Sequence, residues 1–144
     1  MKNPFKLFLP ILIFVLISCS NDSTDDLPQT INPSNVQNIA ITSNWRVTSY
    51  LDDNKNETSD YTGYVFTFNV NGSATAVKNN QTTNGTWSSF TDSNKVKFLI
   101  NFGLTAPLEE ISDDWDVIEI TPQKIRLEDT SGDGSKDFLT FEKN

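Results

Sequence analysis

The chain has 144 residues with 19 acidic and 11 basic side chains, and its formal net charge is −8. Such an acidic surface repels nucleic acid, and the sequence has no basic stripe with interleaved aromatic residues, so we expect no polynucleotide partner. The chain contains no histidine and only one cysteine, which excludes Ser-His-Asp triads, histidine metal sites and intramolecular disulfides.

Residues 1–18 read as a signal peptide. Lys2 and Lys6 make a short positive segment, an apolar run extends from Leu7 to Ile17, and Ser18 supplies a small residue at the cleavage site. The apolar run is about half the roughly 20 residues that a helix needs to cross a bilayer. We therefore expect this segment to be removed and not to remain as a membrane helix.

The four residues Leu16-Ile17-Ser18-Cys19 resemble the lipobox of bacterial lipoproteins. The resemblance implies that the mature chain begins at Cys19, with diacylglycerol on its thiol and a further acyl chain such as palmitate on its amine. Each buried methylene contributes about 0.8 kcal/mol, so several chains on one residue make a durable anchor. The alternative is an unlipidated signal peptide with an incidental cysteine. We expect a membrane partner through Cys19 and a location in the cell envelope, at the outer membrane.

Residues 19–33 are expected to form a flexible, lipidated tether. They are polar and acidic, and they carry too few large apolar side chains to offset the entropy of ordering. Asp22, Asp25 and Asp26 allow two interpretations, because acid-rich stretches after the lipidated cysteine look like the surface-export signals of some Gram-negative lipoproteins, whereas charge blocks are commonly solvated spacers. Exposure at the cell surface follows from the first interpretation only.

The folded domain is expected to span residues 34–144 and to begin with one short helix. Val36, Ile39 and Ala40 recur at helical spacing after Ser34 or Asn35, either of which can cap the helix. After the helix, apolar residues recur at every second position, which is typical of half-buried strands. The runs between turn residues indicate about eight strands, near residues 45–51, 62–70, 73–78, 85–90, 95–102, 115–121, 124–129 and 137–143.

Turn residues separate these strands at short intervals. Asn71-Gly72 and Asn84-Gly85 predict type I′ hairpin turns, and Asp92-Ser93-Asn94 and Gly132-Asp133-Gly134 mark two more turns. Consecutive antiparallel hairpins predict an all-β domain, either a small antiparallel up-and-down barrel or a sandwich. A closed barrel would also remove the exposed edges that an all-β domain must otherwise protect.

Five segments of the domain resemble segments of a known family. They are Trp45-Arg46-Val47, Tyr64-Val65-Phe66-Thr67-Phe68, Gly85-Thr86-Trp87, Asp114-Trp115-Asp116-Val117 and Leu139-Thr140-Phe141-Glu142-Lys143. From about Asn35 to Asn144 the chain resembles the bacterial lipocalin-like lipoprotein domains. The resemblance implies an up-and-down barrel of about eight strands, with Arg126 packed over Trp45. These are mostly core and turn positions, so they bear on fold more than on activity.

The aromatic residues have two interpretations. They can fill the interior of a barrel of about eight strands, which is barely wide enough for side chains, or they can line a pocket for a small apolar ligand. For Trp45 we favour the core, because a tryptophan at the start of a strand with an arginine in reach is a structural device. The candidate ligand-binding residues are Trp87, Trp115, Tyr64, Phe66, Phe68 and Phe98.

The segment from Asp129 to Asp137 resembles a calcium-binding loop. Oxygen-bearing residues alternate along it, with Asp129, Ser131, Asp133 and Asp137 as the candidate metal ligands and Gly134 at the sixth position. The twelfth position is Thr140 where a bidentate glutamate is required, and strands flank the loop where a helix pair is required. A hairpin turn explains the same residues, so we expect no metal here.

Catalysis and cofactors are not expected. Glu109, Glu110, Asp113 and Asp114 form the main carboxylate cluster, but such a cluster on a loop is typical of a solvated face, and a general acid needs burial. Two functions therefore remain open, and we place the first ahead of the second. The barrel can bind a small apolar ligand, or it can be a non-catalytic structural or protein-interaction module of the cell envelope.

Overall fold

The computed structural model describes residues 27–144, so the predicted signal peptide, Cys19 and the first part of the predicted tether lie outside the described residues. The domain contains one α-helix, one short 3-10 helix and nine strands. In chain order they are α1 (Pro33–Ala40), β1 (Asn44–Asp52), β2 (Lys55–Asn56), η1 (Thr58–Tyr61), β3 (Val65–Phe68), β4 (Ser73–Lys78), β5 (Gln81–Asp92), β6 (Lys95–Asn101), β7 (Asp114–Thr121), β8 (Lys124–Thr130) and β9 (Lys136–Lys143). Within residues 27–144 no helix is long and apolar enough to span a bilayer.

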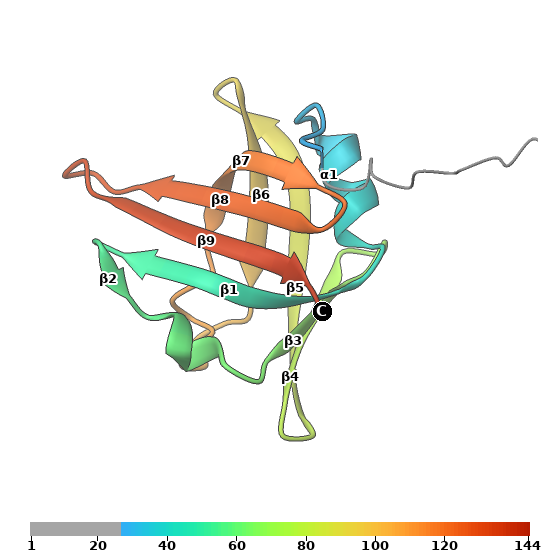
Figure 1. Cartoon of the computed structure of the whole chain (residues 1–144), viewed down its shortest axis with the longest axis vertical. Coiled ribbons are helices and arrows are strands. Elements are labelled where there is room, and N and C mark those ends of the chain that lie inside the picture. Colours follow the sequence, from blue (N-terminus) through green and yellow to red (C-terminus); the bar gives the residue numbers. More distant parts are fainter. Residues whose placement is uncertain (1–26) are drawn as a thin grey trace, which may run out of the picture.

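The strands form a closed antiparallel barrel, as predicted from the sequence. From β3 to β9 each strand pairs with the next one in the chain, β1 pairs with β3, and β1 also pairs with β9, which closes the sheet (Figure 1). The two-residue β2 only folds back onto the end of β1, so the barrel itself has eight strands. Closure leaves no long unpaired edge for another chain to extend.

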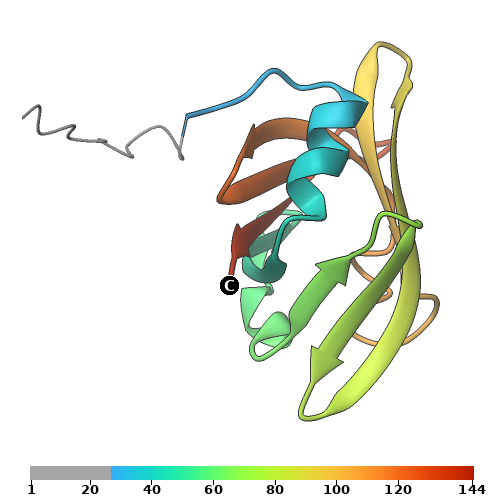
Figure 2. The same cartoon turned by 90° about the vertical axis from the view of Figure 1, so that its right-hand side faces the viewer.

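The up-and-down order places successive connections at alternate ends of the barrel. We call the end that α1 covers the helix end, and its connectors are residues 41–43, 69–72, 93–94 and 122–123 (Figure 2). The opposite end is the loop end, and its connectors are residues 53–64, 79–80, 102–113 and 131–135.

The helix begins earlier than predicted. Its cap is Asn32 and not Ser34 or Asn35, because the Asn32 side chain accepts a hydrogen bond from the Asn35 N–H at 2.9 Å and Pro33 occupies the first helical position. Residues before the helix also lie against the barrel. The Gln29 N–H donates to the Ile120 carbonyl at 2.8 Å, and Ile31 packs on the core. The part of the predicted tether from Gln29 onward is therefore attached to the domain.

Trp45 is part of the core, as predicted, but its polar partner is different. The ring is fully buried, and its indole N–H donates to the Ala40 carbonyl at 2.8 Å, at the last residue of α1. Arg126 does not pack over this ring. It lies on the outer face of β8, where its guanidinium bonds the Glu119 carboxylate at 2.8 Å. The arginine expected from the family resemblance is thus replaced by a helix carbonyl.

The hairpin turn between β4 and β5 is formed by an Asn-Asn pair and not by the predicted Asn-Gly pair. Asn79 and Asn80 have φ values of 51° and 62°, as in a type I′ turn, and they connect β4 to β5. The prediction of a turn at Asn84-Gly85 is wrong, because both residues lie within β5 and pair with β4. β5 consequently begins at Gln81, before the predicted strand of residues 85–90. Turns do occur at residues 69–72, 93–94 and 131–135. The turn at Asn71-Gly72 is not the predicted type I′ turn, because only Gly72 has a positive φ, of 83°.

Gly85 is required by packing and not by a turn. A Cβ atom at this position would lie 2.4 Å from the Asn101 carbonyl oxygen and 2.6 Å from the Phe102 ring, so the neighbouring strand and ring approach the bare backbone. We expect Gly85→Ala to lower the free energy of unfolding by about 2 kcal/mol, as overpacking of a core does.

Urea unfolding followed by tryptophan fluorescence measures this loss. Gly132→Ala is the matched control, because no atom lies within 4 Å of its would-be Cβ and its φ is not positive, so we expect a change within about 0.5 kcal/mol. Equal midpoints for the two variants would contradict the close approach at Gly85.

Candidate functional site

The interior of the barrel is filled by aromatic side chains that contact one another. Phe66, Phe68 and Phe98 are each at most 1 % exposed. The ring centroids of Phe68 and Phe98 are 5.1 Å apart, those of Phe66 and Phe141 are 5.3 Å apart, and those of Phe68 and Phe141 are 5.7 Å apart. Such edge-to-face pairs add roughly 0.5–1.5 kcal/mol each beyond area burial. These three predicted ligand-binding residues therefore belong to one aromatic cluster, in which Phe68 contacts Phe98 directly and Phe66 is linked to Phe68 through Phe141.

Trp87 and Trp115 close the interior at different places. The Trp87 ring lies 5.3 Å from those of Phe68 and Phe98, and its N–H donates to the Asn69 carbonyl at 2.8 Å. The Trp115 N–H donates to the Ile111 carbonyl at 3.0 Å. Both rings are buried with their polar atom satisfied by backbone. The structure does not bring the two tryptophans together around one cavity.

Tyr64 is the one predicted ligand-binding residue that is only half-buried. Its ring is 5.9 Å from Phe66 on one side, and the Lys78 ammonium lies 4.7 Å from its centroid on the other. The cation covers the ring in place of a ligand.

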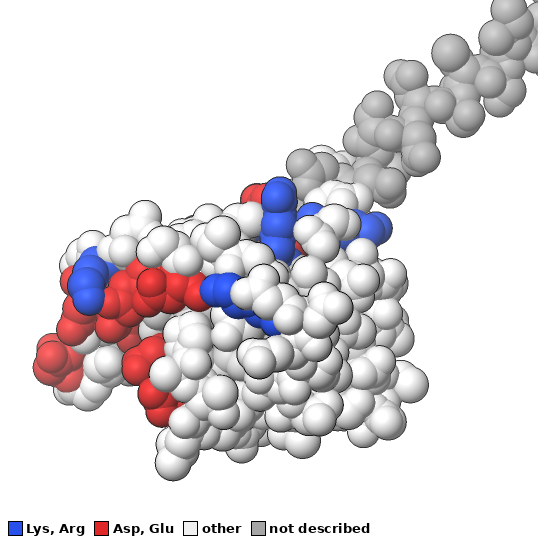
Figure 3. Space-filling view, turned by 90° about the horizontal axis from the view of Figure 1, so that it is seen from below, with Lys and Arg blue, Asp and Glu red and all other residues white. Residues whose placement is uncertain are grey.

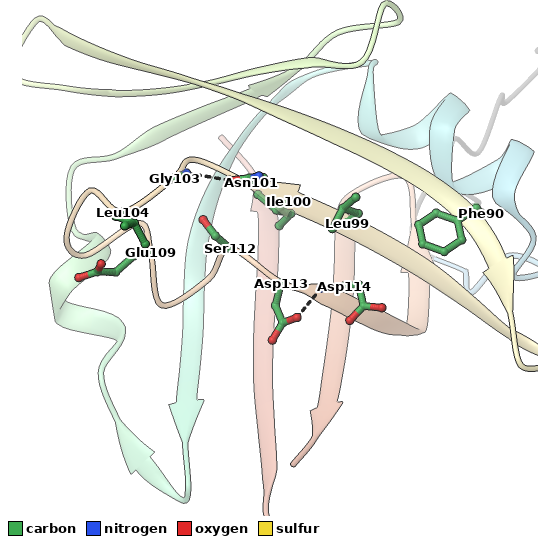
Figure 4. Close-up of a pocket in the computed structure, with 10 residues that line it drawn as sticks. All are labelled: Phe90, Leu99, Ile100, Asn101, Gly103, Leu104, Glu109, Ser112, Asp113 and Asp114. Atoms are coloured by element: carbon green, nitrogen blue, oxygen red, sulfur yellow. Dashed lines mark hydrogen bonds between the residues drawn. The ribbon is translucent and has the colours of Figure 1, made fainter. Parts of the chain in front are cut away.

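A cleft lies on the outside of the barrel, beside the 102–113 connector (Figure 4). Its volume is about 490 Å³. Its apolar lining includes Leu99 and Leu104, and Leu104 is 92 % exposed. Carboxylates of Glu109, Asp113 and Asp114 border the cleft (Figure 4), so we name it the acidic cleft.

The carboxylates of the acidic cleft have few basic partners. Burial raises the pKa of Asp113, although the Asp114 N–H, which donates to Asp113 Oδ1 at 2.7 Å, opposes this shift. The Lys97 ammonium lies 3.9 Å from the Asp114 carboxylate and donates a hydrogen bond to the Asp114 carbonyl at 3.0 Å instead. A basic group bound here would relieve the repulsion between neighbouring acids. The sequence identified this cluster but not the apolar floor beside it, because Leu99 is also a regular position of a predicted strand.

Further acidic residues gather at the loop end of the barrel. Figure 3 shows them together on the side of the β1–β2 and β8–β9 turns. Burial, and then the negative charges of Asp52 and Asp137, raise the pKa of the Tyr50 hydroxyl. Burial and the charge of Asp137 likewise raise the pKa of Asp52. The shifts show that these acids are close enough to repel one another.

The candidate calcium loop forms a hairpin turn. The Asp133 carboxylate accepts hydrogen bonds from the Ser135 N–H at 3.0 Å and the Ser135 hydroxyl at 2.8 Å, which lowers the Asp133 pKa. The Asp137 carboxylate accepts from the Asp53 N–H at 2.9 Å. In the part of the chain that the structure describes, no three acidic residues converge as metal ligands. Asp129, Ser131, Asp133 and Asp137 thus serve turn and strand contacts.

A smaller cleft of about 310 Å³ lies at the helix end, between α1 and the β3–β4 turn. Its lining includes Ile41, Val70 and the edge of Trp87. Ile41 is 38 % exposed and Val70 is 86 % exposed. The apolar spacing of the sequence did not predict that these two residues would be exposed side by side. The signal that could have found them is that the helix-end connectors, which carry both, contain no charged residue.

Comparison with known proteins supports the architecture. No family model matches the chain, and no curated protein matches it significantly. Among solved structures, the chain is similar to the crystal structure of a DUF4847 family protein from Bacteroides vulgatus ATCC 8482, with a TM-score of 0.53 and 18% sequence identity over 76% of this chain and 97% of that chain. At this identity the likeness shows a shared barrel fold.

Proposed function

We propose that the chain is a lipoprotein of the cell envelope, anchored in the outer membrane through lipid on Cys19, and that its barrel is a non-catalytic protein-interaction module. The interaction role is supported mainly by the packing of the barrel interior. Phe66, Phe68 and Phe98 contact other rings and have almost no exposed surface. A ligand inside the barrel would have to displace them, so recognition is assigned to the outer surface.

The acidic cleft is the surface that best fits a protein partner. It combines an apolar floor with the carboxylates of Glu109, Asp113 and Asp114. Its volume falls in the range of about 300–1,000 Å³ that binding pockets occupy. A partner segment with a lysine or arginine next to an apolar side chain matches both features, because the basic head meets the carboxylates and its aliphatic stem lies on the floor.

Site-specific photocrosslinking in the producing bacterium tests this assignment. A photoreactive phenylalanine at Leu104, on the cleft, should give a discrete crosslinked band, and one at Ile118, which is 37 % exposed on β7, should not. The double substitution Glu109→Gln and Asp113→Asn should remove the band from the Leu104 position. A band that survives neutralisation of these carboxylates, or equal bands at both positions, would contradict a role for the acidic cleft.

The alternative role, binding of a small apolar ligand, is tested on the same protein. Native mass spectrometry of the protein purified from its own host should give a mass without a retained small molecule. A retained apolar molecule would overturn the interaction role and restore the barrel interior as the binding site, since the aromatic cluster would then open to admit it.

The lipid anchor is tested separately. Cys19→Ser should move the full-length chain from the membrane fraction to the soluble or secreted fraction, because no other residue of the chain can accept the lipid. Intact mass should show diacylglycerol and an acyl chain on the unsubstituted protein only. A Cys19→Ser variant that stays in the membrane fraction would contradict the anchor.

A further inference from the structure

The two ends of the barrel differ sharply in charge. The helix-end connectors contain no charged residue at all. The loop-end connectors contain a single basic residue, Lys55, and seven acidic residues, which are Asp53, Glu57, Asp60, Glu109, Glu110, Asp113 and Asp133. The domain therefore has uncharged connectors at its helix end and strongly negative connectors at its loop end.

The helix end also carries exposed apolar side chains. Val70 projects from the β3–β4 turn with 86 % of its surface exposed, and Ile41 follows α1 with 38 % exposed. Both line the same cleft, so they form one patch and not two scattered residues. Lys95 and Lys124 directly follow two helix-end connectors, but each is ion-paired, Lys95 with Asp116 and Lys124 with Glu119, so they add little net charge to this end.

The chain enters the domain at this same end. Residues 27–32 lead directly into α1 (Figures 1 and 2), and the Gln29 N–H is bonded to Ile120, just before the 122–123 connector. Only eight residue steps separate Cys19 from Leu27. Even fully extended, such a segment spans no more than about 28 Å. A lipid on Cys19 would therefore keep Leu27, from which the chain leads into the helix end, within that distance of the bilayer.

We propose that the helix end faces the lipid surface, with Val70 and Ile41 in the headgroup region, and that the acidic loop end points away from the membrane. This inference rests on the proposed lipid anchor. Anionic headgroups repel the seven carboxylates of the loop end and do not repel the uncharged helix-end connectors, so both charge and apolar contact favour the same orientation. The acidic cleft, beside the 102–113 connector, is then presented to the aqueous side, where a partner protein can reach it.

Lipid-borne quenching of a fluorophore measures this orientation. The acylated full-length chain is reconstituted into vesicles of phosphatidylethanolamine and phosphatidylglycerol that contain nitroxide-labelled lipid. A single new cysteine is labelled at Asn38 on α1 or at Gly132 in the β8–β9 turn, and an acylated Cys19 does not react. The nine residues of β1 extend about 30 Å between the two ends. We therefore expect quenching at Asn38→Cys to be several-fold stronger than at Gly132→Cys.

The apolar contact has its own matched pair of variants. Val70→Ser should reduce the quenching of the label at Asn38, whereas Leu104→Ser, which removes an equally exposed apolar side chain at the loop end, should not. Vesicle-bound protein with equal quenching at the two labels, or stronger quenching at Gly132→Cys, would overturn the orientation alone. Protein that does not float with the vesicles at all would overturn the anchor and the orientation with it.

Discussion

Trp45→Ala is expected to lower the free energy of unfolding by about 3–5 kcal/mol, the cost of deleting a fully buried large aromatic side chain. The indole is 0 % exposed, and its N–H provides the bond to the Ala40 carbonyl that attaches the end of α1 to the barrel. The variant loses both the core volume and this attachment. Urea unfolding followed by the fluorescence of Trp87 and Trp115 measures the loss.

Two further variants separate these contributions. Trp45→Phe retains most of the apolar volume but leaves the Ala40 carbonyl without its indole donor, which should cost about 1–3 kcal/mol. Val70→Ala removes apolar atoms from a side chain that is 86 % exposed and should change stability by no more than about 0.5 kcal/mol. A loss below 1 kcal/mol for Trp45→Ala would contradict the anchoring role of this tryptophan.

The alternation of apolar residues was enough to predict an all-β domain of antiparallel hairpins, and the family resemblance indicated a barrel in preference to a sandwich. Strands β4, β6 and β8 lie within one or two residues of their predicted bounds, because in each the buried side alternates with the outer side and a turn residue closes the run. The predicted strand of residues 62–70 is longer than β3, which spans only Val65–Phe68. There the chain first makes the turn at Gly63, where φ is 83°.

The local sequence pattern gave a wrong prediction where a residue is required by a contact with another element of the fold. Gly85 follows an asparagine and looks like a turn, but it is needed because Asn101 and Phe102 approach it from β6 and its following loop. Trp45 was expected to need an arginine, and its partner is a carbonyl five residues earlier in the chain. Similarly, the aromatic residues of a packed core and of a binding pocket have the same sequence pattern. Only their mutual contacts distinguish the two.

Asp116→Ala is expected to lower the free energy of unfolding by about 3 kcal/mol, the lower part of the range for breaking a buried ion pair. Asp116 bonds Lys95 and lies 2.7 Å from the Lys97 ammonium, whose side chain is only 13% exposed. Its removal leaves Lys97 largely desolvated, with the Asp114 carbonyl at 3.0 Å and the Asp114 carboxylate at 3.9 Å as its other partners. Chemical denaturation at pH 7 measures the loss, and Glu142→Gln, in an exposed pair with Arg46 at 3.8 Å, is the control with about 0–1 kcal/mol.

The same pair predicts a pH dependence whose sign identifies the mechanism. Burial alone would raise the pKa of Asp116, but hydrogen bonds from Lys95 and Lys97 outweigh it and hold the pKa below the ordinary value. The unfolded chain therefore takes up the proton first, so the stabilisation is complete about one pH unit above the ordinary pKa of about 3.9 and falls as the pH drops through the lowered pKa of the folded state. The gap in stability between the unsubstituted chain and Asp116→Ala should thus narrow from pH 5 to pH 2. A gap that stays constant over this range would mean that Asp116 acts by packing and not by charge.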